Sequence, residues 1–152
     1  MLLQVTREIR PEGGVVVGDD GSDVAGRAVR FALDEARRRD APLHVLRAWT
    51  MMTAELPPDV PAGIVPSLSE LESSTLAAEQ ARIAELIGDE AVEVHVCHGP
   101  PAQVLLAASE SADVLIVGNR GRGGVASLLL GSVAEECVRR ADCPVVVARG
   151  RL

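Results

Sequence analysis

Residues 118–132 read Gly118-Asn119-Arg120-Gly121-Arg122-Gly123-Gly124-Val125-Ala126-Ser127-Leu128-Leu129-Leu130-Gly131-Ser132. A short apolar run, 114–117, precedes this stretch, and a segment with helical spacing follows from Ser132. Glycine lets backbone N–H groups approach an anion closely, and the N-terminus of a helix adds a partial positive charge. The stretch therefore predicts a phosphate-binding turn between a strand and a helix.

The rest of the chain alternates apolar runs with amphipathic segments. Apolar runs predict five strands, and apolar residues at helical spacing predict four helices. We expect strands at 14–18, 43–49, 92–97, 114–117 and 144–148, and helices at about 24–39, 68–87, 102–111 and from 132 onward. This alternation is typical of an α/β fold in which an open, parallel, five-stranded sheet carries helices on both faces.

Two of these strands have patterns that indicate sheet edges. Residues 92–97 alternate strictly, with three valines on one face and Glu93, His95 and Cys97 on the other, so one face is expected to be wetter. The last strand in the sequence, 144–148, is also apolar throughout, so an edge position would leave an apolar strand uncovered. Because an apolar edge needs a cover, we expect a homodimer that pairs through Val145–Ala148.

We expect residues 1–152 to form a single domain with its core at about 14–149 and an N-terminal extension at 1–12. Residues 50–67 contain four prolines, which exclude a regular helix and predict a surface loop. Ser132-Val133-Ala134-Glu135 has the form of a capping box, in which the serine and the glutamate side chains satisfy backbone N–H groups.

Composition excludes several classes of protein. The net charge of −7 argues against DNA or RNA as a partner, because phosphate contacts need an excess of basic residues. The chain contains no lysine, so a phosphate loop built on lysine is excluded. No apolar run approaches the roughly 18 residues that a membrane helix needs. The first 11 residues lack the apolar centre of a signal peptide, so we expect a cytoplasmic protein.

The cysteines and histidines carry weaker signals. Cys97, Cys137 and Cys143 form an odd set without paired spacing, which favours reduced thiols. His95, Cys97 and His98 could form a metal triad, but strand alternation separates them and no fourth ligand is evident. A structural role is the favoured interpretation, and His44 is interpreted as a hydrogen-bonded histidine within a strand.

Three motifs together make the chain resemble the universal stress protein family. Val17-Gly18-Asp19-Asp20-Gly21-Ser22 resembles the family's opening motif, and 118–133 resembles the glycine motif of its ATP-binding branch, here Gly-x2-Gly-x9-Gly-Ser. Residues 141–147 are similar to its last strand. The resemblance implies a Rossmann-like fold of the adenine nucleotide alpha hydrolase type, sheet order 3-2-1-4-5 and dimerisation through the fifth strand.

The resemblance also implies positions for the site. Asp20 is expected to contact the ribose or adenine side of a nucleotide, with Gly18 and Asp19 beside it, and the main chain of Ala48 to bond adenine. The phosphates and ribose are expected to be bordered by Val117, Gly118, Asn119, Arg120 and Gly121 and held by Gly131, Ser132 and Val133.

Asp19 departs from the family pattern, which commonly has an apolar residue there. A second carboxylate beside Asp20 could repel a triphosphate, could bind Mg²⁺ or could point to solvent.

The resemblance implies an ATP-binding switch or sensor in a stress response, with Mg²⁺ accompanying the ATP and a protein partner that the sequence does not identify. No nucleophile or general base is evident around the motif, so at most weak ATP hydrolysis is expected. Two alternatives stay open. One is a slow Mg²⁺-dependent ATPase or nucleotidyl-transfer enzyme. The other is a dimeric interaction protein in which ATP, AMP or a cyclic nucleotide is structural.

Overall fold

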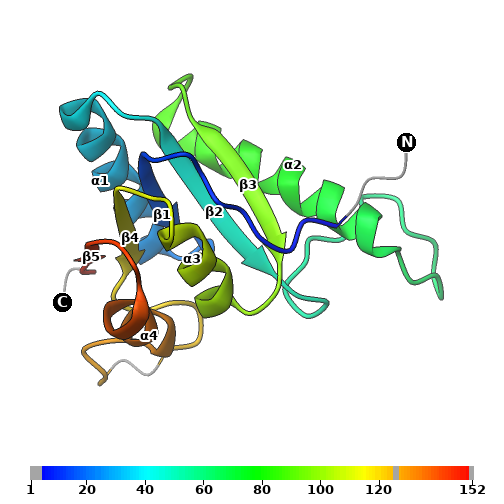
Figure 1. Cartoon of the computed structure of the whole chain (residues 1–152). Helices are drawn as coiled ribbons and strands as arrows, with labels where there is room; N and C mark the ends of the chain where they lie inside the picture. The colour runs from blue at the N-terminus through cyan, green and yellow to red at the C-terminus, as the bar shows by residue number, and fades with distance from the viewer. Residues whose placement is uncertain (1–4, 125–126, 151–152) are drawn as a thin grey trace.

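The computed structural model describes residues 5–124 and 127–150. Within them a five-stranded parallel sheet has the order β3-β2-β1-β4-β5 (Figure 1). The strands are β1 (Val15–Gly18), β2 (Leu43–Trp49), β3 (Glu93–His98), β4 (Val114–Gly118) and β5 (Val145–Ala148), and the helices are α1 (Asp23–Arg39), α2 (Leu68–Ile87), α3 (Pro101–Ser109) and α4 (Ser132–Arg140). The predicted fold class and strand order are confirmed.

Helices cover the sheet on both faces. Val15 and Val17 of β1 face a cluster closed by α1 and α2, whereas Val16 between them faces a cluster closed by α3 and α4. The central strands β1 and β4 are therefore buried on both sides, as a parallel sheet requires. No described helix is long and apolar enough to cross a membrane.

The helix N-termini differ from one another in how they are capped. Ser22 accepts a hydrogen bond from the N–H of Ala25 at the start of α1, and Ser67 forms a complete capping box with Glu70 at the start of α2. The capping box predicted at Ser132 is wrong. Gly131 is the N-cap of α4, and no side chain of the described residues caps that helix. Because the chain turns one residue earlier than expected, Ser132 begins the helix instead of capping it.

The edge position predicted for β3 is confirmed, but the wetter face predicted for it is only partly right. Glu93 is exposed and His95 partly so, whereas Cys97 is fully buried. The N-terminal extension explains the difference: Thr6 accepts a hydrogen bond from the N–H of His98, and Ile9 packs against the cluster that contains Cys97 (Figure 1). Since the extension covers the carboxyl end of this face, only its amino end stays open to solvent.

Two further expectations concern the loop and the last strand. Residues 50–67 contain no helix or strand, as their prolines predict, and they leave Met52 and Val65 strongly exposed. β5 pairs only with β4 among the described strands, so it lies at the predicted edge. All four of its residues are partly exposed, which leaves an apolar edge for a partner.

Candidate functional site

The main pocket of the described structure lies at the carboxyl ends of the central strands. Strand order reverses between β1 and β4, since α1 leaves β1 for one face and α4 follows β4 on the other. In open α/β sheets, ligands bind at such a switch point. The pocket has a volume of about 400 Å³, within the range of small-molecule sites.

All twelve residues that the sequence placed at the site line this one pocket. They are Gly18, Asp19, Asp20, Ala48, Val117, Gly118, Asn119, Arg120, Gly121, Gly131, Ser132 and Val133. Sequence reasoning missed Thr53, Pro101 and Leu105, which also line it. Thr53 follows β2 closely and Pro101 opens the helix after β3, so their place at the ends of parallel strands was an available signal. The contact of each residue with a ligand stays a prediction.

The N-terminus of α4 forms one wall of the pocket. Gly131, Ser132 and Val133 line it, and Gly131 offers no side chain to cap the N–H groups of the first turn. Uncapped N–H groups and the helix dipole together make a site for an anion. This wall can therefore hold a phosphate or a carboxylate through the main chain.

Asn119 holds the two ends of the glycine-rich loop together. It is buried, its side-chain Nδ2 donates to the carbonyl of Leu129 at 3.2 Å, and its own carbonyl accepts from the N–H of Gly131 at 2.6 Å. Its Oδ1 accepts from the N–H of Gly150 at 3.2 Å, beyond β5. Asn119 thus shapes the loop from behind, a role that its position in the glycine motif did not reveal.

Asp20 joins the turn after β1 to the same loop. Its Oδ1 accepts from the N–H of Ser22 at 2.9 Å, and its Oδ2 accepts from the N–H of Arg122 at 2.8 Å. A Cβ at Gly121 would lie 2.6 Å from that Oδ2, so only glycine permits this approach. The carboxylate closes the loop onto β1 across the mouth of the pocket.

Asp19 points away from Asp20, toward α2. Its side chain is fully buried, and Arg82 binds both of its oxygens, with Nε at 2.8 Å from Oδ2 and Nη2 at 3.3 Å from Oδ1. The N–H of Gly21 donates to Oδ1 as well. Burial acts to raise the pKa of Asp19, but the hydrogen bonds from Arg82, Glu79 and Gly21 outweigh it and hold the pKa below its usual value. The interpretation of Asp19 as solvent-facing is wrong, and Arg82 already neutralises its charge.

This ion pair continues into a charged network that is buried at Arg47 and Glu79 and open to solvent at Glu55. Arg47 of β2 donates to Glu79 of α2 at 3.3 Å and to Glu55 of the 50–67 loop at 3.1 Å. Burial raises the pKa of Glu79 to about 8, and the neighbouring Asp19 carboxylate adds to the rise against the attraction of Arg47. The sequence did not predict this network, because a glutamate on an amphipathic helix is normally assigned to the solvent face.

The metal triad considered from the sequence does not form. His98 lies on the opposite face of β3 from Cys97 and packs against Trp49, with 4.6 Å between ring centroids. Cys97 is buried, and burial raises the pKa of its thiol to about 12. The structure groups His95 with His44 and Glu93 instead.

Residues 14–149 match the universal stress protein family, from the start of β1 to the end of β5. The chain belongs to the universal stress protein family. The match includes the whole sheet and every pocket residue named above, so the family covers both the fold and the site.

Curated relatives agree with this membership. Two universal stress proteins of Mycobacterium tuberculosis are each 38% identical to the chain, one over 138 residues and the other over 135 residues. These matches cover 91% and 89% of the chain but only 46% and 45% of the relatives. The chain thus spans less than half the length of these curated relatives.

Solved structures of the family share the fold. A universal stress protein from Lactobacillus plantarum superposes with a TM-score of 0.68 at 22% identity, over 93% of this chain and all of that one. A universal stress protein solved in complex with cAMP gives 0.64 at 28% identity, over 90% and 96% of the two chains. One from Archaeoglobus fulgidus, in complex with dAMP, gives 0.56 at 25% identity, over 90% and 97%. Relatives with this fold therefore bind nucleotides.

The raised pKa of Glu79 predicts a stability that falls as pH rises. Between about pH 4.5 and pH 8, folded Glu79 keeps a proton that the unfolded chain releases, so the free energy of unfolding falls by up to about 1.4 kcal/mol for each pH unit in this window. Glu79→Gln should remove most of this dependence. We expect urea unfolding to show the wild-type protein losing on the order of 1 kcal/mol or more between pH 5 and pH 8.

Glu85→Gln, an exposed position on the same helix, is the matched control and should keep the wild-type slope. An equal pH dependence in the Glu79→Gln protein would show that Glu79 does not carry the proton.

Proposed function

We propose that this universal stress protein binds ATP at the pocket and acts as a nucleotide-dependent switch. The observation that carries the proposal is the uncapped N-terminus of α4 behind a glycine-rich loop. It offers main-chain N–H groups where the family's glycine motif is expected to hold phosphates. The relatives solved with cAMP and dAMP support an adenine nucleotide as the ligand class.

In the proposed complex the nucleotide lies across the ends of the central strands. Adenine bonds the main chain of Ala48 on β2, the ribose lies near Asp20 at the end of β1, and the phosphates meet Gly131, Ser132 and Val133. Apolar Leu46 and Leu105 supply walls for the base, since both line the pocket. Arg122 on the loop adds positive charge, and its guanidinium lies against Gly21.

The two aspartates limit how Mg²⁺ can accompany the nucleotide. Both oxygens of Asp19 are bound to Arg82, and both oxygens of Asp20 accept backbone N–H groups. Asp19 is engaged by Arg82, whereas each oxygen of Asp20 keeps a second lone pair with which it can bind Mg²⁺. Otherwise the ion is held by phosphate oxygens and water, the ligands that Mg²⁺ commonly retains in proteins.

The proposed switch works through two segments at the rim of the pocket, the glycine-rich loop and the 50–67 loop. A ligand that takes Asp20 frees the N–H of Arg122 and so changes the glycine-rich loop. Thr53, in the 50–67 loop, lines the pocket. Glu55 of the same loop pairs with Arg47, and its N–H donates to the hydroxyl of Thr75 on α2. We propose that nucleotide changes segment 50–67, whose exposed apolar side chains form a surface for a protein partner.

The apolar edge strand supports a second part of the proposal, a homodimer that pairs through β5. Val145–Ala148 stay partly exposed at the edge, and another β5 would satisfy and cover them.

Gly131→Val should weaken ATP binding by at least about tenfold, or about 1.4 kcal/mol. The backbone of Gly131 lies in the extended region that valine adopts, and a Cβ there would meet its nearest neighbours at an ordinary 3.5 Å. The variant should therefore fold while its branched side chain obstructs the phosphate wall. Isothermal titration calorimetry with ATP, AMP and cAMP, each with and without Mg²⁺, gives affinity and ligand preference.

Ala91→Val, at an exposed position outside the nucleotide pocket, is the control and should bind ATP like the wild-type protein. Unchanged affinity in the Gly131→Val protein would contradict the site. Tighter binding of AMP or cAMP would favour the structural-nucleotide alternative, and release of phosphate that Asp20→Ala abolishes would favour the ATPase alternative.

The switch predicts that ATP alters hydrogen exchange beyond the residues that touch it. Mass spectrometry should show slower exchange in 118–124 and a changed rate in 54–67. Residues 28–33 should stay constant, because they lie within α1 and outside the pocket, and their inner face packs on the core. A change confined to the pocket lining would contradict the switch and leave binding intact.

The dimer predicts a sedimentation mass of twice the chain's 15.9 kDa at micromolar concentration. A monomer that persists at high concentration, with and without ATP, would contradict pairing through β5.

A further inference from the structure

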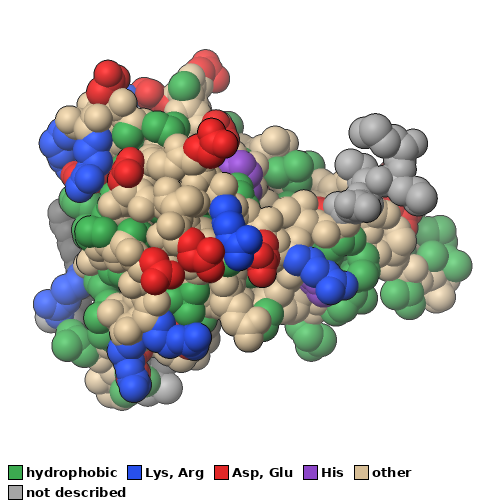
Figure 2. Space-filling model, viewed as in Figure 1, with side chains coloured by type: hydrophobic (Ala, Val, Ile, Leu, Met, Phe, Trp, Pro, Cys, Tyr) green, Lys and Arg blue, Asp and Glu red, His purple; other side chains and the backbone are tan. Residues whose placement is uncertain are grey.

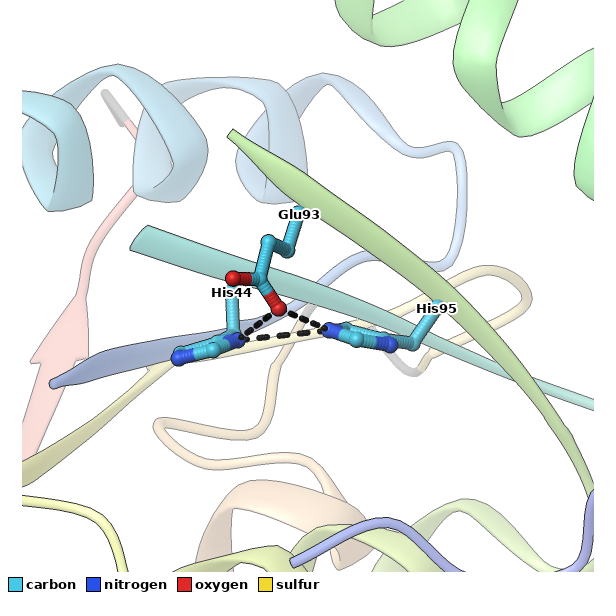
Figure 3. A group of neighbouring side chains, drawn as sticks. All are labelled: His44, Glu93 and His95. Carbon is cyan, nitrogen blue, oxygen red and sulfur yellow. Dashed lines mark hydrogen bonds and ion pairs between the residues drawn. The ribbon is translucent and has the colours of Figure 1, made fainter. Parts of the chain in front are cut away.

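Three side chains of the amino half of β2 and β3 point their polar atoms toward one another (Figure 3). Nδ1 of His44 lies 3.2 Å from Nε2 of His95 and 3.3 Å from Oε2 of Glu93. Nε2 of His95 lies 3.6 Å from the same Oε2. The three atoms form a nearly equilateral triangle.

Strand pairing places these residues together. His44 pairs directly with Glu93, and Leu46, two residues further on, pairs with His95, so all three side chains project from one face of the sheet. That face is the one on which α3 and α4 pack, but the cluster lies toward the amino ends of the strands. None of the three residues lines the nucleotide pocket at the carboxyl ends. The cluster is therefore a separate site, and its role is independent of the proposed nucleotide switch.

The triangle has the dimensions of a metal-binding set. Zinc binds imidazole nitrogen and carboxylate oxygen at about 2.0–2.2 Å, so two ligand atoms of a tetrahedral site lie about 3.3–3.5 Å apart. The observed separations of 3.2, 3.3 and 3.6 Å match this edge length without movement of the backbone.

A proton can join only two of these three atoms. A proton on one facing nitrogen can bond the other nitrogen, which leaves Oε2 of the exposed Glu93 to water. A dication accepts all three lone pairs at once. Burial and the neighbouring His44 lower the pKa of His95, which favours the neutral imidazole that a metal needs.

The tautomer of His44 is also free to adapt. Its other ring nitrogen, Nε2, is buried and has no hydrogen-bond partner among the described residues. No contact at Nε2 therefore fixes which of the two ring nitrogens carries the proton. The imidazole can place its proton there and turn an unprotonated Nδ1 toward the cluster. His44 is almost fully buried, which gives the set one rigid member.

We propose that His44, Glu93 and His95 bind a divalent transition-metal ion of the zinc class. Two imidazole nitrogens and one carboxylate oxygen make a donor set that zinc uses when it keeps an open position, whereas Mg²⁺ and Ca²⁺ prefer all-oxygen sets. Glu93 and His95 are partly open to solvent, so water takes the fourth position. Figure 2 shows histidine atoms at the surface beside acidic side chains on the face viewed.

The ion would act as a clamp on the edge of the sheet. It links the edge strand β3 to β2 through side chains, near the end of the interface that the N-terminal extension leaves uncovered. Because metal binds the folded arrangement, it adds stability in proportion to its concentration and affinity. The structure thus assigns this cluster a metal-dependent stabilising role.

Titration of nucleotide-free, tag-free protein with Zn²⁺ against a chromophoric chelator tests the site. We expect one ion per chain, and Co²⁺ in its place should give the intense visible absorption of tetrahedral coordination. Glu93→Gln and His95→Gln should each weaken binding by at least about tenfold. Mutation of a residue that only hydrogen-bonds to a metal ligand costs about 10–100-fold in affinity, and removal of a ligand itself should cost no less. Zn²⁺ should raise the melting temperature of the wild-type protein and of neither variant.

His98→Gln is the matched control, because it removes the only other histidine of the chain and leaves the cluster intact. It should bind Zn²⁺ like the wild-type protein. Glu93 is exposed, so its substitution keeps the fold and makes the test independent of the buried His44. Absence of binding, equal binding by the Glu93→Gln and His95→Gln proteins, or a thiolate-to-cobalt band from the cysteines would each overturn the proposal.

Discussion

The structure depends on the need of a parallel sheet to be covered on both faces. β1 and β4 are buried almost throughout, so the connections that leave them must place helices on both sides. α1 goes to one face and α4 to the other, and the loops after β1 and β4 diverge at their carboxyl ends. The pocket is the space left between these loops, so the same requirement that builds the core also locates the site.

The polar groups of the pocket show how neighbours in sequence acquire different roles. Asp19 and Asp20 are adjacent, but in the segment just after β1 the first side chain points toward α2 and the second toward the glycine-rich loop. Arg82 neutralises Asp19, whereas Asp20 holds a main-chain N–H at the mouth of the pocket. A carboxylate next to a phosphate site therefore need not repel the ligand, because one is paired and the other can exchange its partner.

Polar residues also connect the pocket to the rest of the molecule. One network links β2, α2 and the loop after β2: Arg47 and Glu79 are buried, and Glu55 extends the network to the surface. On the opposite end of β2, His44 meets two residues of β3 across the sheet. β2 is thus an apolar strand with polar side chains toward both ends. Arg47 contacts α2 and the following loop, and His44 contacts β3.

Local periodicity sufficed to predict the order of elements, and glycine spacing predicted the turn after β4. The strand order and the twelve predicted site positions, all of which line the pocket, came from the family resemblance. Local patterns misplaced the cap of α4, where the chain turns one residue earlier than expected, and the environment of Cys97, which depends on how the distant N-terminal extension packs. The Asp19–Arg82 pair, the buried Glu79 and the His44–Glu93–His95 cluster lie beyond such patterns. Their partners are 63, 32 and about 50 residues apart, and only the register of β2 on β3 and the packing of α2 bring them within bonding distance.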